Sequence, residues 1–258
     1  MAYTAIRLED VEGVRVIRLA RPERKNALDL IMREELREAL EVSSSHQEVR
    51  ALVLTGEGSD FSVGGDLSTM ENLTAAGGRK RVQRVGGLVG LMRQMAQPIL
   101  ASVDGVATGA GLGLALACDL IVASDRARFG VGQVRVGLVP DLGLTRHLPL
   151  RVGWTKAMEM MLQGHLIEAS KALEWGLINR VVPHSKLLEE TLSWASQLAR
   201  GPSVAISMVK ECMDRFPMSL EQTLRWEANL QAIAFLTEDF AEAREAFFQK
   251  RKPRFRGR

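Results

Sequence analysis

An aspartate within an apolar run is the residue of this chain best suited to moving a proton. Asp141 follows Pro140 in the segment 129–146, and Val139 and Leu142 lie beside it. A carboxylate in apolar surroundings costs free energy unless it is paired, hydrogen-bonded or kept for chemistry. Two interpretations therefore stay open for Asp141: a turn residue after proline, or a general base that transfers protons.

Two glycine-rich turns precede this aspartate, and each follows a predicted buried strand. They are 61–66 (Phe-Ser-Val-Gly-Gly-Asp) and 105–113 (Gly-Val-Ala-Thr-Gly-Ala-Gly-Leu-Gly), the second of which enters a helix. Glycine lets the backbone approach a ligand closely, and a helix N-terminus offers unpaired N–H groups. Two such turns would form an oxyanion hole. They also fit tight helix–strand packing or, through 109–113, a dinucleotide fingerprint that lacks its usual spacing.

Composition excludes several classes of protein. The chain has 258 residues, is 46% hydrophobic and 25% charged, and has a net charge of +3, as ordinary globular proteins do. Its two cysteines, Cys118 and Cys212, form no disulfide framework. The start has no apolar signal core, and the apolar stretch 112–123 is shorter than the roughly 20 residues of a membrane span. We expect a cytoplasmic protein with no membrane partner.

Metal and nucleic-acid binding are also not expected. The four histidines have no metal-ligand spacing. The basic tail 250–258 could contact phosphates without specificity, but the small net charge does not favour a nucleic-acid partner. Apart from Asp141, we interpret the aspartates Asp66, Asp104 and Asp119 as structural residues. We interpret His147 as a packing residue, although His147 lies close to Asp141 in the chain.

The order of predicted elements indicates an α/β fold, because buried strands alternate with glycine loops and helices. Strands are predicted at 5–9, 14–19, 50–55, 99–103 and 120–123, and helices after Asp29, at 79–96, after 109, around 154–161 (Trp154, Ala157, Met158 and Met161 on one face), around 169–173, and at 185–199, 203–214, 218–235 and 238–250. The sequence pattern changes at Gly201-Pro202, and we use this position to divide the chain into 1–200 and 201–258.

Six segments, in their order and spacing, make the chain resemble the crotonase (enoyl-CoA hydratase/isomerase) superfamily over nearly its whole length. They are 21–28, 61–67, 104–119, 137–145, 172–177 and 247–255. The resemblance implies a spiral of ββα units, with a CoA and acyl site in the core (1–200) and a C-terminal helical trimerisation region (201–258). It implies an acyl-CoA substrate and a homo-oligomer, either a trimer or a dimer of trimers. It implies no cofactor, because coenzyme A is part of the substrate.

The resemblance also assigns site residues. The two oxyanion N–H groups fall on the backbone of Gly65 and Ala110. Contacts to CoA fall on Lys25 and Ala27, and on Phe247 and Lys250 from an adjacent subunit; the last two also fit a solvated tail. The helix at 68–95 and the loop before it would line the acyl pocket.

Two departures from the family decide which reaction we expect. The two glutamates of family hydratases fall on Gly113 and Gln133, and neither residue can act as a general base. Asp141 instead matches the Pro-Asp-x-Gly position of family isomerases, among them dienoyl-CoA and ring-epoxide isomerases. We therefore expect an acyl-CoA isomerase, of the Δ3/Δ2-enoyl-CoA or ring-epoxide type. A hydratase or other crotonase reaction by a nonstandard route, and a noncatalytic acyl-CoA-binding protein, stay open.

Overall fold

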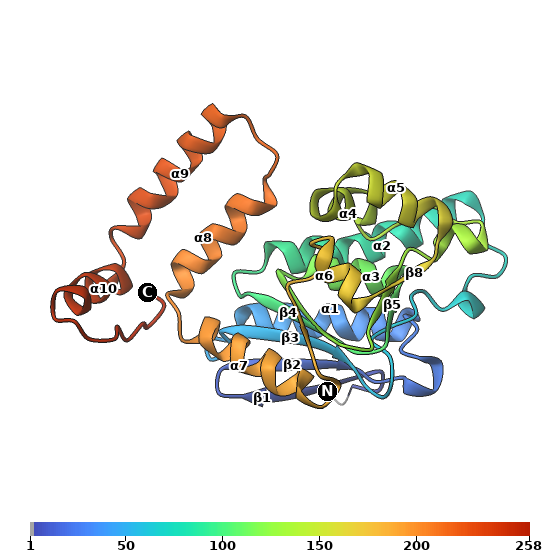
Figure 1. The fold of residues 1–258 in the computed structure, drawn as a ribbon, viewed down its shortest axis with the longest axis horizontal. Coiled ribbons are helices and arrows are strands. Elements are labelled where there is room, and N and C mark those ends of the chain that lie inside the picture. The colour runs from blue at the N-terminus through green and yellow to red at the C-terminus, as the bar shows by residue number, and fades with distance from the viewer. Residues whose placement is uncertain (1–2) are drawn as a thin grey trace.

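The computed structural model describes residues 3–258 and contains two β-sheets (Figure 1). Met1 and Ala2, which the predicted core 1–200 includes, lie outside the described residues. The strands are β1 (Ile6–Val11), β2 (Val14–Leu19), β3 (Ala51–Gly56), β4 (Ile99–Val103), β5 (Val106–Thr108), β6 (Leu120–Ser124), β7 (Arg128–Gly130), β8 (Leu166–Glu168) and β9 (Arg180–Val182). The large sheet has the order β1-β2-β3-β4-β6-β9, and the small one the order β5-β7-β8.

The large sheet is parallel except at one edge. Strands β1 and β2 form an antiparallel hairpin, and every later neighbour pairs in parallel. Parallel neighbours need crossover connections, and the helices that lie between the strands in the chain supply them. The helices are α1 (Leu30–Ser45), α2 (Ala75–Gln94), α3 (Ala110–Ala117), α4 (Leu144–Val152), α5 (Trp154–Gln163), α6 (Ala169–Glu174), α7 (Leu187–Ala199), α8 (Ser203–Asp214), α9 (Leu220–Ala234) and α10 (Glu238–Phe248), the last four of which follow the final strand.

Local sequence signals explain where helices begin. The Asp29 carboxylate accepts a hydrogen bond of 2.8 Å from Met32 N, which caps α1 as predicted. Helix α2 begins earlier than predicted because the Thr74 hydroxyl caps it, accepting from Gly77 N at 3.1 Å. The apolar stripe of α1, which includes Leu36, packs into the main core.

Some elements were not predicted. Strands β5, β8 and β9 have three residues each, which is too short for a period-two pattern to be recognised. Helix α4 was missed because Pro149 lies inside it. The predicted face of α5 was wrong in part: Trp154 is 72% exposed, and Ala157 and Met160 are the buried residues.

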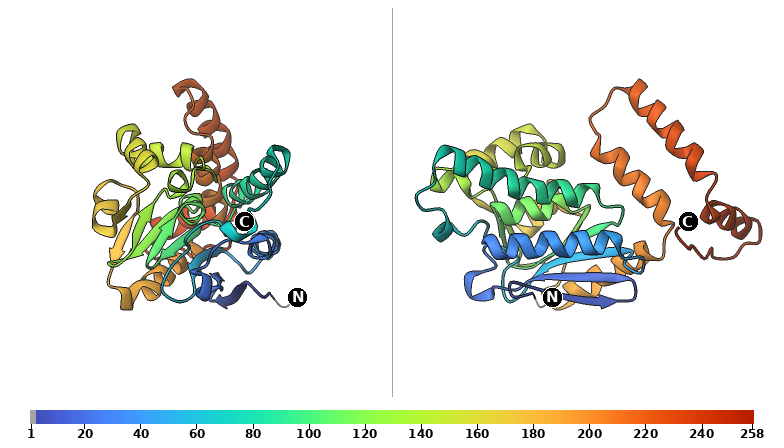
Figure 2. Two further views of the ribbon diagram at one scale, coloured as in Figure 1. Left: turned by 90° about the vertical axis from the view of Figure 1, so that its right-hand side faces the viewer. Right: turned by 180° about the vertical axis from the view of Figure 1, so that it is seen from behind.

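Helices α8, α9 and α10 project from the core (Figures 1 and 2). The core helix α7 ends at Ala199 and α8 begins at Ser203. The division into 1–200 and 201–258 stays a prediction. This projecting part exposes a set of large apolar side chains: Val209, Met213, Phe216, Leu220, Leu224, Ile233, Phe235, Leu236, Phe240, Phe247 and Phe248. In residues 3–258, no helix is both long and apolar enough to cross a bilayer.

Candidate active site

The two glycine-rich turns lie against each other. Ser62 N donates to Val106 O at 3.0 Å, and Thr108 N donates to Ser62 O at 3.1 Å. Gly64 has φ +100°, and a Cβ there would lie 2.9 Å from Thr108 O and 3.2 Å from Ala110 N. Only glycine permits this conformation and approach, so Gly64 is the residue that brings the two turns together.

Gly65 and Ala110 line one cavity of about 360 Å³. Ala110 is the first residue of α3, so its N–H has no acceptor within the helix. Among residues 3–258, the N–H groups of Gly65 and Ala110 pair with no other acceptor. Gly65 does not have a positive φ. A Cβ on Gly65 would meet only flexible side-chain ends: Met70 Cε at 2.8 Å and Arg33 Nη2 at 3.5 Å.

Asp141 lines the same cavity and is half-buried. Gln133 Nε2 donates a hydrogen bond of 3.1 Å to Asp141 Oδ1. This partner fixes the orientation of the amide, because an amide oxygen facing a carboxylate would repel it. Gln133 Oε1 is buried, has no partner within residues 3–258, and would lie 3.6 Å from a Cβ on Gly109. The carboxylate, the amide and the two N–H groups thus line one cavity.

A strained turn holds Asp141 in place. Leu142 has φ +51°, which is uncommon for a side chain of this kind, and Gly143 has φ +75°. A Cβ on Gly113 would lie 2.7 Å from Leu142 Cβ. Leu142 therefore occupies the space that a side chain at Gly113, one of the two hydratase glutamate positions, would need.

The apolar run around Asp141 is less buried than its sequence indicates. Val136, Leu138 and Val139 are exposed, Val139 by 79%, whereas Leu142 is buried. The reason is the 3-10 helix at 133–136 and the loop after it, which lie at the surface.

The cavity walls include apolar side chains and a residue that the sequence analysis missed. Five apolar side chains come from α2 and the loop before it: Leu67, Met70, Leu73, Val82 and Val85. That this cavity is the acyl pocket stays a prediction. Arg33 of α1 also lines the cavity and is only 9% exposed. Burial, together with the charge of Arg81, lowers the pKa of Arg33 to about 10. Its position on the apolar stripe of α1, three residues before Leu36, was the signal that could have identified it.

The predicted CoA contacts are not gathered at this cavity within one chain. Ala27 is buried, its carbonyl accepts from Arg21 Nη1 at 2.9 Å, and Lys25 is exposed beside it. Phe247 and Lys250 lie at the end of α10, which stands apart from the core (Figures 1 and 2).

The other candidate acids and the histidine have structural contacts. Asp66 pairs with Arg21 at 3.3 Å, Asp104 with Arg126 at 2.8 Å (Nε to Oδ1), and Asp119 with Lys210 at 2.7 Å. His147 Nδ1 lies 3.3 Å from Leu116 O and lines a different cavity. Within residues 3–258, no group of three metal-binding side chains occurs.

Comparisons with known proteins agree with this arrangement. The family model for enoyl-CoA hydratase/isomerase matches residues 9–258. A "probable enoyl-CoA hydratase" of Rhizobium meliloti is 36% identical over the full length of both chains, and one of Rhodobacter capsulatus is 40% identical over the full length of both. The crystal structure of an enoyl-CoA hydratase subunit I from Geobacillus kaustophilus is 34% identical, with a TM-score of 0.95 over 99% of each chain. The predicted α/β fold is confirmed.

Proposed function

The chain belongs to the enoyl-CoA hydratase/isomerase family, and on that premise we propose that it is an acyl-CoA isomerase of the Δ3/Δ2-enoyl-CoA or ring-epoxide type. One observation carries the proposal. Among the described residues that line the cavity with Gly65 and Ala110, Asp141 alone has a carboxylate. A reaction that needs one base therefore fits these residues better than one that needs two.

The proposed reaction moves one proton. Asp141 removes a proton from a carbon of the allylic system next to the thioester and returns it to another carbon, which shifts the double bond. The thioester oxygen becomes negative during this step, and the N–H groups of Gly65 and Ala110 stabilise it. Each such donor is typically worth about 10²–10³ in rate. The Gln133 amide holds the carboxylate toward the substrate.

Binding of CoA is proposed to involve two subunits. Lys25 and Ala27 would contact CoA from one subunit, and Phe247 and Lys250 from its neighbour. The exposed apolar side chains of α8–α10 support an oligomer, since large apolar side chains gathered on one exposed part of a protein often mark a protein–protein interface. We expect a trimer or a dimer of trimers, with coenzyme A as part of the substrate and no further cofactor. A cytoplasmic location stays a prediction.

The names of the relatives favour a second candidate, an enoyl-CoA hydratase that works by a nonstandard route. In that reaction, Gln133 and Asp141 would orient and activate a water molecule together, in place of two glutamates. A noncatalytic acyl-CoA-binding protein is the third possibility.

Isotope labelling separates these functions. The enzyme is incubated with a trans-3-enoyl-CoA and, separately, with a trans-2-enoyl-CoA, each in water labelled with ¹⁸O. We expect conversion of the 3-enoyl to the 2-enoyl thioester without incorporation of ¹⁸O. A 3-hydroxyacyl-CoA carrying ¹⁸O would support the hydratase instead. Binding without any conversion of either substrate would support the noncatalytic protein.

A further inference from the structure

Arg33 is a buried cation that forms no ion pair with any residue in the range 3–258. Its side chain comes from the buried face of α1, it is only 9% exposed, and its Nε has no hydrogen-bond partner within residues 3–258. Two nearby carboxylates are already engaged. Asp29 and Asp66 both pair with Arg21 Nη1, at 3.0 and 3.3 Å. A buried charge is unfavourable unless it is paired, so the guanidinium lacks the partner that its environment requires.

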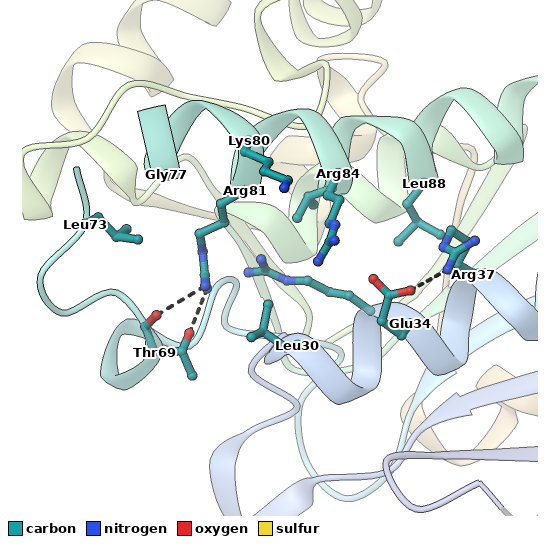
Figure 3. Close-up of a pocket in the computed structure, with 12 residues that line it drawn as sticks. Leu30, Glu34, Arg37, Thr69, Leu73, Gly77, Lys80, Arg81, Arg84 and Leu88 are labelled. Carbon is teal, nitrogen blue, oxygen red and sulfur yellow. Dashed lines mark hydrogen bonds and ion pairs between the residues drawn. The ribbon is translucent and has the colours of Figure 1, made fainter. Parts of the chain in front are cut away.

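This cation lies where two cavities meet. Arg33, Leu73, Arg81 and Val85 line both the cavity that contains Asp141 and a second cavity of about 370 Å³ between α1 and α2. Arg84 reaches from α2 into this second cavity, and Arg81 reaches from α2 toward Thr69 (Figure 3).

The second cavity is basic. Besides the arginines already named, Arg37 and Lys80 line it. The carboxylate of Glu34 also lines it, but Glu34 pairs with Arg37. Arg81 is held in place, because it donates to Thr69 O at 3.2 Å and to Thr69 Oγ1 at 2.7 Å. The region beyond the oxyanion N–H groups therefore has an excess of positive charge.

We propose that the acyl group of the substrate carries a second carboxylate, and that Arg33 binds it. The substrate class is then the mono-CoA thioester of a dicarboxylic acid. A guanidinium matches a carboxylate with two parallel N–H···O hydrogen bonds, which would satisfy the unpaired Nε. This inference rests on the proposed function, because it requires a CoA thioester in the same cavity. The chain length between thioester and carboxylate is left to the experiment.

Burial does not remove the charge of Arg33. Its lowered pKa of about 10 still leaves the guanidinium protonated at neutral pH. The same cation has two other conceivable partners: a phosphate of CoA, or Asp141, whose charge acts favourably on it. The acyl carboxylate is favoured because Arg33 lies beside Gly65, where the thioester would be held.

The test measures binding of saturated thioesters, which need no turnover, by calorimetry. Each dicarboxylic ligand is paired with a monocarboxylic one of equal carbon number: malonyl- with propionyl-CoA, glutaryl- with pentanoyl-CoA, and adipyl- with hexanoyl-CoA. CoA without an acyl group is measured as well, to detect a contact with its phosphates. The variants are Arg33→Met, Arg33→Lys and the control Arg37→Met, which removes an exposed cation that lines only the second cavity. Circular dichroism establishes that each variant folds.

We expect the wild-type chain to prefer the dicarboxylic member of at least one pair by about tenfold or more. Arg33→Met should abolish the preference and leave the monocarboxylic ligands and CoA within about twofold. Arg33→Lys should retain part of the preference, and it also tests the inference if the Met variant does not fold. Arg37→Met should retain all of it.

Three results would overturn the inference. The wild-type chain could show no preference in any pair, Arg33→Met could lose equal affinity for both members of a pair, or Arg33→Met could bind CoA alone more weakly. An equal loss would indicate a role toward Asp141 or in packing, and weaker CoA binding would indicate a phosphate contact. These failures leave the proposed reaction intact. Failure to bind any acyl-CoA would instead defeat the proposed function itself.

Discussion

Gln133 Nε2 donates to Asp141 Oδ1 at 3.1 Å, so the residue at one hydratase position holds the carboxylate at the isomerase position. The second hydratase position, Gly113, is also linked to this aspartate. It packs against Leu142, the residue that follows Asp141 in the turn. Both departures from the two-glutamate pattern therefore contribute to the placement of one acid. This relationship is the physical basis of the first three predictions below.

Replacing the proposed base should abolish most of the isomerisation. Asp141→Asn keeps the size and the turn but cannot accept a proton, so kcat should fall by about 10²–10⁴. Binding of a saturated acyl-CoA should change little. The rate is measured on a proven 3-enoyl-CoA, together with proton exchange at the α-carbon in deuterated water. A variant with near-normal kcat would defeat the assignment of Asp141.

Gln133→Glu should move the pH–rate profile toward higher pH. The new carboxylate would lie near Asp141, and two like charges at hydrogen-bond distance disfavour ionisation of both. Because the base must be ionised to act, half-maximal activity should require a higher pH than in the wild type. Gln133→Ala is the matched control, and we expect only a mild decrease in rate without such a displacement. An unchanged profile in the Glu variant would show that the two side chains do not interact in solution.

Gly113→Ala should destabilise the protein and impair the reaction. The added Cβ would lie 2.7 Å from Leu142 Cβ, and overpacking of this kind typically costs about 1–3 kcal/mol. The free energy of unfolding is measured in urea and kcat on the same preparation. Gly86→Ala on α2 is the control, since a Cβ there meets nothing within 4 Å and should stabilise the helix by about 0.5–1 kcal/mol. Equal stability of the two variants would contradict the packing described.

Loss of one oxyanion N–H should affect the rate more than binding. Gly65→Pro removes the donor and should lower kcat by about 10²–10³. Gly65→Ala keeps the N–H, and its Cβ displaces only the end of Met70, so its rate should stay within about tenfold of the wild type. Circular dichroism and CoA affinity serve as controls for folding. Similar values of kcat in the two variants would contradict the role of the Gly65 N–H as an oxyanion donor.

Lys250→Ala should weaken CoA binding if a neighbouring subunit completes the site. Helix α10, which precedes Lys250, stands apart from the core (Figure 1), so the effect should appear only in the oligomer. Calorimetry measures the affinity for CoA, and light scattering measures the oligomeric state. Lys252→Ala, two residues further along the same tail, is the control. Unchanged CoA affinity in an oligomeric Lys250→Ala protein would exclude this contact.

Much of the fold was determined by local sequence. The alternating strands β1 and β2 and the apolar stripe of α1 each depend on neighbouring residues, so strands β1–β4 and the helices between them were predictable. The turns that hold Gly65 and Ala110 were also identifiable, because both segments are rich in glycine. Three-residue strands were not predictable, since pairing with distant strands, and not their own pattern, stabilises them.

Only the tertiary structure decided how the site is assembled. Nothing in the sequence relates Gln133 to Asp141, or Gly113 to Leu142, because these contacts depend on how one turn packs against α3. Arg33 shows the same limit: its residue type on an apolar stripe was visible, but the shared cavity and the engaged carboxylates became apparent only in three dimensions. Local patterns fix which elements form, whereas packing between distant segments fixes which side chains meet.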